Sequence, residues 1–150
     1  MIAFPQVGAL VVDASLFVQL FVEEPATAVI TGYLSEEHKM DRFLAPSILA
    51  SETAAAITKK LLRKEIDVRS AREAFASLQQ TLSEGAFELL PANEFIDSAF
   101  ELSVKLHHPL HDCLYLAVAK AHTALFATRD DVLAAKARGI GLETDLVGGR

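Results

Sequence analysis

Gly-Ala-Leu-Val-Val-Asp, residues 8–13, is the stretch of sequence that decides the fold. Its valine-rich apolar run is typical of a strand buried on both faces, as in a parallel sheet. The run ends in a carboxylate, Asp13. Ligands of open α/β sheets bind outside the carboxyl ends of the strands, so the sequence predicts a central strand whose end lies beside a binding site. An equally weighted alternative is that Asp13 only caps a helix starting near Ser15.

The rest of the chain alternates helical and strand-like segments, which predicts an α/β fold with a short, mainly parallel central sheet flanked by helices. Pro25 ends the first helix, Pro46 and Ser47 suit the first turn and N-cap of a long helix, and Asp67 or Ser70 suits the next N-cap. Helices are expected at 15–24, 26–37, 46–64, from 67 or 70 to 83, 91–107, 112–122 and 130–138; strands at 8–12, 43–45, 86–90, 125–127 and 140–146; and a loop at 38–42.

Length and composition predict a single domain over residues 1–150. Apolar residues make up 51% of the chain, which excludes a disordered tail, and the net charge of -6 argues against binding nucleic acid through overall charge alone. The single cysteine, Cys113, excludes an internal disulfide framework and a cysteine-rich zinc site. We find no secretory signal and no convincing membrane span, and therefore expect a soluble cytoplasmic protein.

Glu52 does not fit its surroundings in the helix expected at 46–64. Its neighbours three and four residues away are Ile48, Leu49 and two alanines, so a carboxylate sits on the apolar face. A charged and unpaired carboxylate is costly there, and a cation or a cleft would remove that cost. The alternative is a position at the core margin, from which Glu52 reaches solvent or pairs with Lys59 or Lys60.

Two more acids occupy positions where strands end or helices begin. Asp112 begins an almost wholly apolar helix, and Asp130 follows the strand expected at 125–127. Each of them alone could be an N-cap, with Asp131 sharing that role. Together with Asp13 and Glu52 they form a set of four carboxylates, and such a cluster is stable mainly when it binds a cation. Oxygen ligands favour Mg²⁺ or Mn²⁺ over zinc.

Four short motifs, in order and with matching spacing, resemble those of the PIN domain family. They are Val-Val-Asp-Ala-Ser (11–15), Ala-Pro-Ser-Ile-Leu-Ala-Ser-Glu (45–52), His-Asp-Cys-Leu-Tyr-Leu-Ala-Val-Ala (111–119) and Ala-Thr-Arg-Asp (127–130). Their acids are Asp13, Glu52, Asp112 and Asp130. The resemblance spans essentially the whole chain, and the chain has the size of the VapC-type toxins of bacterial toxin–antitoxin pairs. His111, before the third acid, and the extra carboxylate of Asp131 depart from the pattern.

The resemblance implies a PIN-like fold and an endoribonuclease that depends on Mg²⁺ or Mn²⁺. It further implies a homodimer, an RNA substrate and a cognate antitoxin protein, as in a type II toxin–antitoxin system. All four acids are expected to be catalytic and to serve the metal site. Asp13 and Asp130 are the first choices as direct ligands, while Asp112 and Glu52 are expected to hold metal-bound waters or a second ion. Ser15 and Thr128 suit hydrogen bonds to the metal-binding acids, although ordinary capping explains them as well.

Basic side chains gather after the second motif and are candidates for binding the phosphate backbone. Lys59 lies seven residues after Glu52, on nearly the same helix face two turns away. Arg129 is a second candidate, and a solvated helix surface is the alternative for the cluster. The cluster comprises Lys59, Lys60, Arg63, Lys64, Arg69 and Arg72.

The histidines and the aromatic residues have mainly structural interpretations. His107, His108 and His111 lack the spacing of a zinc motif, so a helix end and a loop are expected, with His111 as a possible substrate contact. Tyr115 and Cys113 fall on an apolar stretch and are expected in the core.

Two other kinds of site share one feature with the metal-dependent ribonuclease. Phosphatase and receiver-type aspartate sites also place an Asp after the first strand. The former expects a second Asp where Ser15 stands, and the latter expects an acidic pair and a late lysine that the sequence lacks. The remaining alternative is a non-catalytic PIN-like module that binds nucleic acid or protein.

Overall fold

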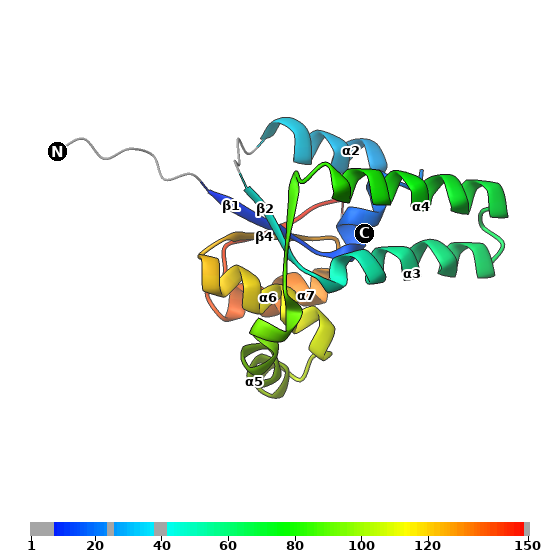
Figure 1. Cartoon of the computed structure of the whole chain (residues 1–150). Helices are drawn as coiled ribbons and strands as arrows, with labels where there is room; N and C mark the ends of the chain where they lie inside the picture. The colour runs from blue at the N-terminus through cyan, green and yellow to red at the C-terminus, as the bar shows by residue number, and fades with distance from the viewer. Residues whose placement is uncertain (1–7, 24–25, 38–41, 149–150) are drawn as a thin grey trace.

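The computed structural model of the 150-residue chain describes residues 8–23, 26–37 and 42–148. In this part of the chain five parallel strands form one sheet in the order β3-β2-β1-β4-β5 (Figure 1). The predicted α/β fold with a central parallel sheet is therefore confirmed. The strands are β1 (Ala9–Val12), β2 (Arg42–Pro46), β3 (Phe87–Leu90), β4 (Leu125–Thr128) and β5 (Thr144–Leu146).

Helices connect the strands and cover the sheet. In Figure 1, α3 and α4 form a pair that projects from the sheet to the right, and α5, α6 and α7 lie together below the sheet. The helical elements are α1 (Ala14–Phe17), η1 (Val18–Leu20), α2 (Thr27–Gly32), η2 (Tyr33–Glu37), α3 (Ile48–Leu62), α4 (Val68–Ser83), η3 (Ala92–Phe95), α5 (Ile96–Leu106), α6 (Leu110–His122) and α7 (Asp131–Gly139).

The core is built around β1 and α6, as their apolar sequences predict. Leu10, Val11 and Val12 are fully buried, because β1 lies between β2 and β4 in the middle of the sheet and α6 packs against it. Every residue of α6 from 113 to 119 is buried, since this helix packs against β1 and β2 and is covered by α5. No helix in the described part of the chain combines the length and the apolar character needed to cross a membrane.

Several expected element boundaries are wrong, and local geometry explains why. The helix expected at 15–24 is only α1 followed by the 3₁₀ turn η1, and the one expected at 26–37 ends in the π-helical turn η2. The helix expected at 91–107 begins as the 3₁₀ turn η3 and ends where His107 adopts a left-handed conformation, φ 51°. The last strand starts at 144 rather than 140, because Gly141 (φ 86°) and the bond from Leu142 N to Ala137 O form the turn that ends α7.

Two predicted helix caps have different outcomes. Asp67 caps α4 as expected, since its carboxylate accepts a hydrogen bond from Ser70 N at 2.8 Å. Ser47 precedes α3 but makes no side-chain cap bond; its hydroxyl accepts the Ala92 N–H at 3.0 Å instead. Residues 38–41 of the expected loop, and Pro25, lie outside the described residues, and Arg42 already belongs to β2.

The central strands should contribute strongly to stability. Leu44 lies in β2 and is fully buried, so Leu44→Ala is expected to lower the free energy of unfolding by about 2–5 kcal/mol. The matched control is Leu62→Ala, because Leu62 is 81% exposed; its effect should stay within about 0.5 kcal/mol. Urea unfolding of the three proteins measures the difference. Equal losses for the two variants would contradict the placement of β2 in the core.

Candidate functional site

The strand order places a binding site at the carboxyl ends of β1 and β4. From β1 the chain continues outward through β2 and β3, and then returns to the other side of β1 with β4 and β5. This reversal is the topological switch point of an open parallel sheet, where ligands bind outside the carboxyl ends of the strands. Asp13 directly follows β1, and one residue, Arg129, separates Asp130 from the end of β4. The two acids therefore come from the two strands that flank the switch point.

Asp13 is a buried carboxylate at the end of the central strand, and it also caps α1, so the capping interpretation is confirmed. It is only 4% exposed. Its Oδ1 accepts hydrogen bonds from Ser15 Oγ at 2.7 Å and from Leu16 N at 3.1 Å, the second of which caps α1. Its Oδ2 accepts a hydrogen bond from Thr128 Oγ1.

The surroundings of Asp13 penalise its negative charge. Burial raises the pKa of Asp13 from its usual value of 3.8 to about 6, against the opposing effect of the Ser15, Thr128 and Leu16 hydrogen bonds. The nearby charge of Asp112 raises the pKa further. Each unit of pKa corresponds to about 1.4 kcal/mol, so the ionised form costs about 3 kcal/mol. A cation beside Asp13 would offset that cost.

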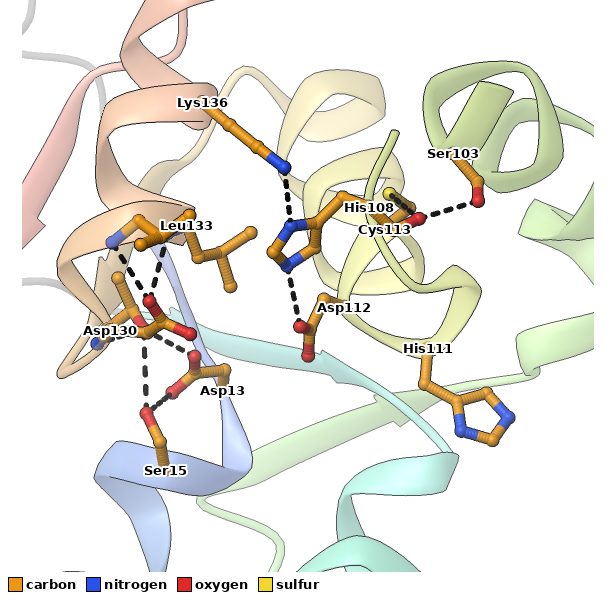
Figure 2. Close-up of polar contacts among 12 residues, drawn as sticks. Asp13, Ser15, Ser103, His108, His111, Asp112, Cys113, Asp130, Leu133 and Lys136 are labelled. Atoms are coloured by element: carbon orange, nitrogen blue, oxygen red, sulfur yellow. Dashed lines mark hydrogen bonds and ion pairs between the residues drawn. The ribbon is translucent and has the colours of Figure 1, made fainter. Parts of the chain in front are cut away.

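Thr128 connects Asp13 to Asp130. Its hydroxyl donates to Asp13 Oδ2 and accepts the N–H of Asp130 at 3.0 Å. Asp130 in turn caps α7, as the capping interpretation expected: its Oδ1 accepts hydrogen bonds from Val132 N at 2.9 Å and Leu133 N at 3.1 Å. Both cap bonds fall on Oδ1, so the cap uses one of its two carboxylate oxygens. In Figure 2 the side chains of Asp13 and Asp130 lie together at this strand edge.

Asp112 is not the N-cap of α6, so the capping interpretation is wrong for this residue. Pro109 occupies that position, and Asp112 lies in the first turn, where the helix dipole favours a negative charge. Its side chain is 35% exposed, and its Oδ2 lies 2.8 Å from His108 Nε2. Its charge affects Asp13, and Figure 2 shows Asp112 facing the pair formed by Asp13 and Asp130.

Glu52 is half-buried, and two residues of α6 surround its carboxylate. The hydroxyl of Tyr115 donates to Glu52 Oε1 at 2.6 Å, and His111 Nδ1 lies 3.8 Å from Oε2. With its side chain 28% exposed, Glu52 lies at the core margin, as the alternative interpretation held. Its partners are Tyr115 and His111, however, whereas Lys60, one of the two lysines expected beside Glu52, pairs with Glu65 at 3.5 Å.

Tyr115 joins the acids, a role that its apolar sequence context did not predict. Its ring is buried in the core, as expected, but its hydroxyl reaches the site. Burial, the bond to Glu52 and the charges of Glu52, Asp13 and Asp112 all raise its pKa well above the usual range. The hydroxyl therefore contacts Glu52 and lies within electrostatic range of Asp13 and Asp112. No signal in the sequence distinguishes a core tyrosine from one whose hydroxyl enters a site.

The predicted phosphate-binding residues lie at separate places, and Arg129 is next to the acids, because its backbone N–H donates to Ser15 Oγ at 3.3 Å. Lys59 and Arg63 are exposed on and after α3, which runs away from the sheet in Figure 1. Arg69 forms an exposed pair with Glu73 at 3.1 Å. Arg129 is half-buried, and its guanidinium donates to the carbonyl of Gly148, with both bonds 3.3 Å long. Their contact with a substrate stays a prediction.

The three histidines have different positions, consistent with the expectation of a helix end and a loop. His107 ends α5, His111 is exposed in the first turn of α6, and His108 is buried between α6 and α7. His108 contacts both Asp112 and Lys136, and sequence reasoning missed it. The only sequence signal for it is its spacing of four residues before Asp112.

The donor atoms fit a hard cation, although they are not gathered into a finished site. Among the described residues, no three His, Cys, Asp or Glu side chains lie close enough to hold a metal ion as they stand. The acids at the switch point nevertheless offer oxygen atoms only, which suits Mg²⁺ or Mn²⁺. The buried charge of Asp13, whose contacts are hydroxyls and an amide, is the feature that such an ion would compensate. The residues predicted to hold it are Asp13, Glu52, Asp112 and Asp130.

The raised pKa of Asp13 predicts a specific pH dependence of stability without metal. Between pH 3.8 and about 6 the folded protein binds the Asp13 proton more tightly than the unfolded chain, so this residue makes unfolding easier as the pH rises. Asp13→Asn should therefore be more stable than the wild type by about 3 kcal/mol at pH 7, and similar to it at pH 3.5. Urea unfolding in chelator across this range measures the difference. A constant difference between the two proteins would contradict the shift.

Comparisons with known proteins agree with this architecture. The model of the PIN domain family matches residues 10–139. A comparison with curated protein sequences found no match.

Three solved structures share the fold. VapC20 of Mycobacterium tuberculosis, described as a sarcin-ricin loop cleaving toxin, has a TM-score of 0.64 and 14% identity, over 84% of this chain and 93% of that one. FitAcB of Neisseria gonorrhoeae has a TM-score of 0.62 and 15% identity, over 90% of this chain and 95% of that one. PAE2754 of Pyrobaculum aerophilum has a TM-score of 0.61 and 24% identity, over 88% of each chain. With the family match over residues 10–139, the chain belongs to the PIN domain family.

Proposed function

We propose that this PIN domain is an endoribonuclease that depends on Mg²⁺ or Mn²⁺ and acts as the toxin of a type II toxin–antitoxin pair. The observation that carries the proposal is the buried carboxylate of Asp13 at the switch point of the sheet. Its charge is desolvated, the charge of Asp112 acts on it, and the Thr128 hydroxyl links it to Asp130. Such an arrangement is unfavourable for stability, which is typical of a functional site.

The chain's own residues would divide the work at this centre. Asp13 and Asp130 are proposed as direct ligands, and Asp112 and Glu52 as holders of metal-bound waters or of a second ion. Ser15 and Thr128 fix the orientation of Asp13 through its two oxygens, and Tyr115 fixes that of Glu52. When bound, the cation would supply an activated water and offset the negative charge that develops on the phosphate.

The substrate and the partners rest on the family and on the four motifs. PIN domains are generally nucleases, and the described neighbour VapC20 is a toxin that cleaves the sarcin-ricin loop. We extend this to an RNA substrate, a cognate antitoxin, a homodimer and a cytoplasmic location. Because the net charge is -6, attraction of RNA has to be local, and Lys59, Arg63 and Arg129 are the proposed contacts.

Cleavage of a labelled single-stranded RNA tests this function. The wild type should cut internal phosphodiesters with Mn²⁺ or Mg²⁺ and lose activity in chelator, because the cation supplies the activated water. Asp13→Asn should lower the rate by at least 100-fold while remaining folded. The matched control is Glu84→Gln, a carboxylate that is exposed near the amino end of β3, at the opposite edge of the sheet; it should cut at the wild-type rate.

Two results would count against the ribonuclease. Undiminished cleavage by Asp13→Asn would show that the activity belongs elsewhere or to a contaminant. RNA that is bound but never cut, with either metal, would favour a non-catalytic binding module.

A further inference from the structure

A chain of contacts runs from α7 through His108 to Asp112. Lys136 Nζ lies 3.0 Å from His108 Nδ1, and His108 Nε2 lies 2.8 Å from Asp112 Oδ2. Figure 2 shows the three side chains in this order, with the imidazole between the ammonium and the carboxylate. The lysine therefore reaches Asp112 through a histidine and not directly.

The lysine determines which ring nitrogen of the histidine carries the proton. An ammonium group can only donate hydrogen bonds, so His108 Nδ1 has to be the acceptor in its contact with Lys136. Lys136 Nζ also donates to the carbonyl of His107 at 3.2 Å, which holds the amine at this place. The ring proton is then on Nε2, where it is donated to Asp112 Oδ2. A carboxylate is the acceptor that this tautomer requires.

The histidine is held rigidly enough to orient its partner. Its side chain is 8% exposed, and its carbonyl accepts a hydrogen bond from Ser103 Oγ at 2.6 Å. Its backbone N–H donates to the Ser103 carbonyl at 3.3 Å. The segment between α5 and α6 is thereby fastened to α5, and the ring has little freedom to turn.

Asp112 needs such support more than an ordinary surface carboxylate. Its side chain is 35% exposed, yet its charge acts on Asp13, and like charges at close range repel. An N–H donor at Oδ2 fixes the plane of the carboxylate. The contact uses Oδ2 only. Lys136 also lies on α7, the helix that Asp130 caps, so the chain of contacts joins the elements that carry the third and fourth acids.

We propose that His108 is a positioning residue of the metal centre, and that Lys136 fixes it in the Nε2–H tautomer that holds Asp112 for cation binding. The inference rests on the proposed function, because it assigns Asp112 to the metal centre. Residues that orient metal-binding side chains typically change metal affinity by 10–100-fold when they are removed.

The test measures the affinity for Mn²⁺ by calorimetry and the tautomer of His108 by ¹⁵N NMR of the metal-free protein. His108→Ala should weaken Mn²⁺ binding by 10–100-fold, whereas His108→Gln, whose amide N–H replaces Nε2–H, should restore it to within about threefold. Lys136→Met should weaken binding by up to tenfold and abolish the single Nε2–H tautomer expected of the wild type. Lys120→Met, an exposed lysine of α6, is the matched control and should change neither property.

The outcomes separate this inference from the proposed function. If Asp112→Asn loses Mn²⁺ binding while folded His108→Ala binds as tightly as the wild type, the inference is wrong and the metal centre stands. An Nδ1–H tautomer in the wild type would also overturn it. If His108→Ala does not fold, the Mn²⁺ affinities of Lys136→Met and His108→Gln decide. Weaker binding by Lys136→Met with retained binding by His108→Gln supports the inference. Unchanged binding by Lys136→Met overturns it. Wild-type affinity in both Asp13→Asn and Asp112→Asn would instead contradict the proposed function.

Discussion

The burial of the Asp13 carboxylate at the end of the central strand is the constraint on which the rest of the site depends. The strand lies between β2 and β4, and its last three residues are fully buried, so the residue that follows it enters a space from which water is largely removed. Two hydroxyls and one amide compensate the charge in part, but the pKa of Asp13 still rises. The domain therefore holds a destabilising group at its centre, a cost that function explains better than folding does.

The neighbouring elements bring other acids toward Asp13 without a direct contact between the carboxylates. Thr128 links it to the end of β4, and thereby to Asp130, by two bonds of one hydroxyl. The first turn of α6 brings Asp112, and the same helix supplies Tyr115 for Glu52 of α3. Each acid has a partner of its own, a cap amide, a histidine or a phenol, that fixes it in the absence of a cation. This explains how four carboxylates share one edge of the sheet and the fold remains stable.

The sequence predicts the fold class and the positions of the acids well, because both depend on local patterns. The apolar run before Asp13 indicates a central strand, the apolar stretch at 112–122 indicates a buried helix, and Glu52 is anomalous on its own helix face. The hydroxyls of Ser15 and Thr128 were expected to bond the acids, and both donate to Asp13. The tyrosine partner of Glu52 was not predictable, since it depends on a contact between distant segments. Ser47 looks like a helix cap but binds Ala92, and Lys136 meets His108 from 28 residues away. Tyr115 was expected in the core, and its ring is buried there, but its hydroxyl bonds Glu52.

The measurement that tests the central claim most directly is an anomalous difference map from crystals soaked in Mn²⁺. The account predicts a peak at the carboxyl ends of β1 and β4, bounded by Asp13, Asp112 and Asp130, and the loss of that peak in Asp13→Asn crystals. Peaks confined to surface residues such as His111, with none beside Asp13 at saturating Mn²⁺, would contradict it.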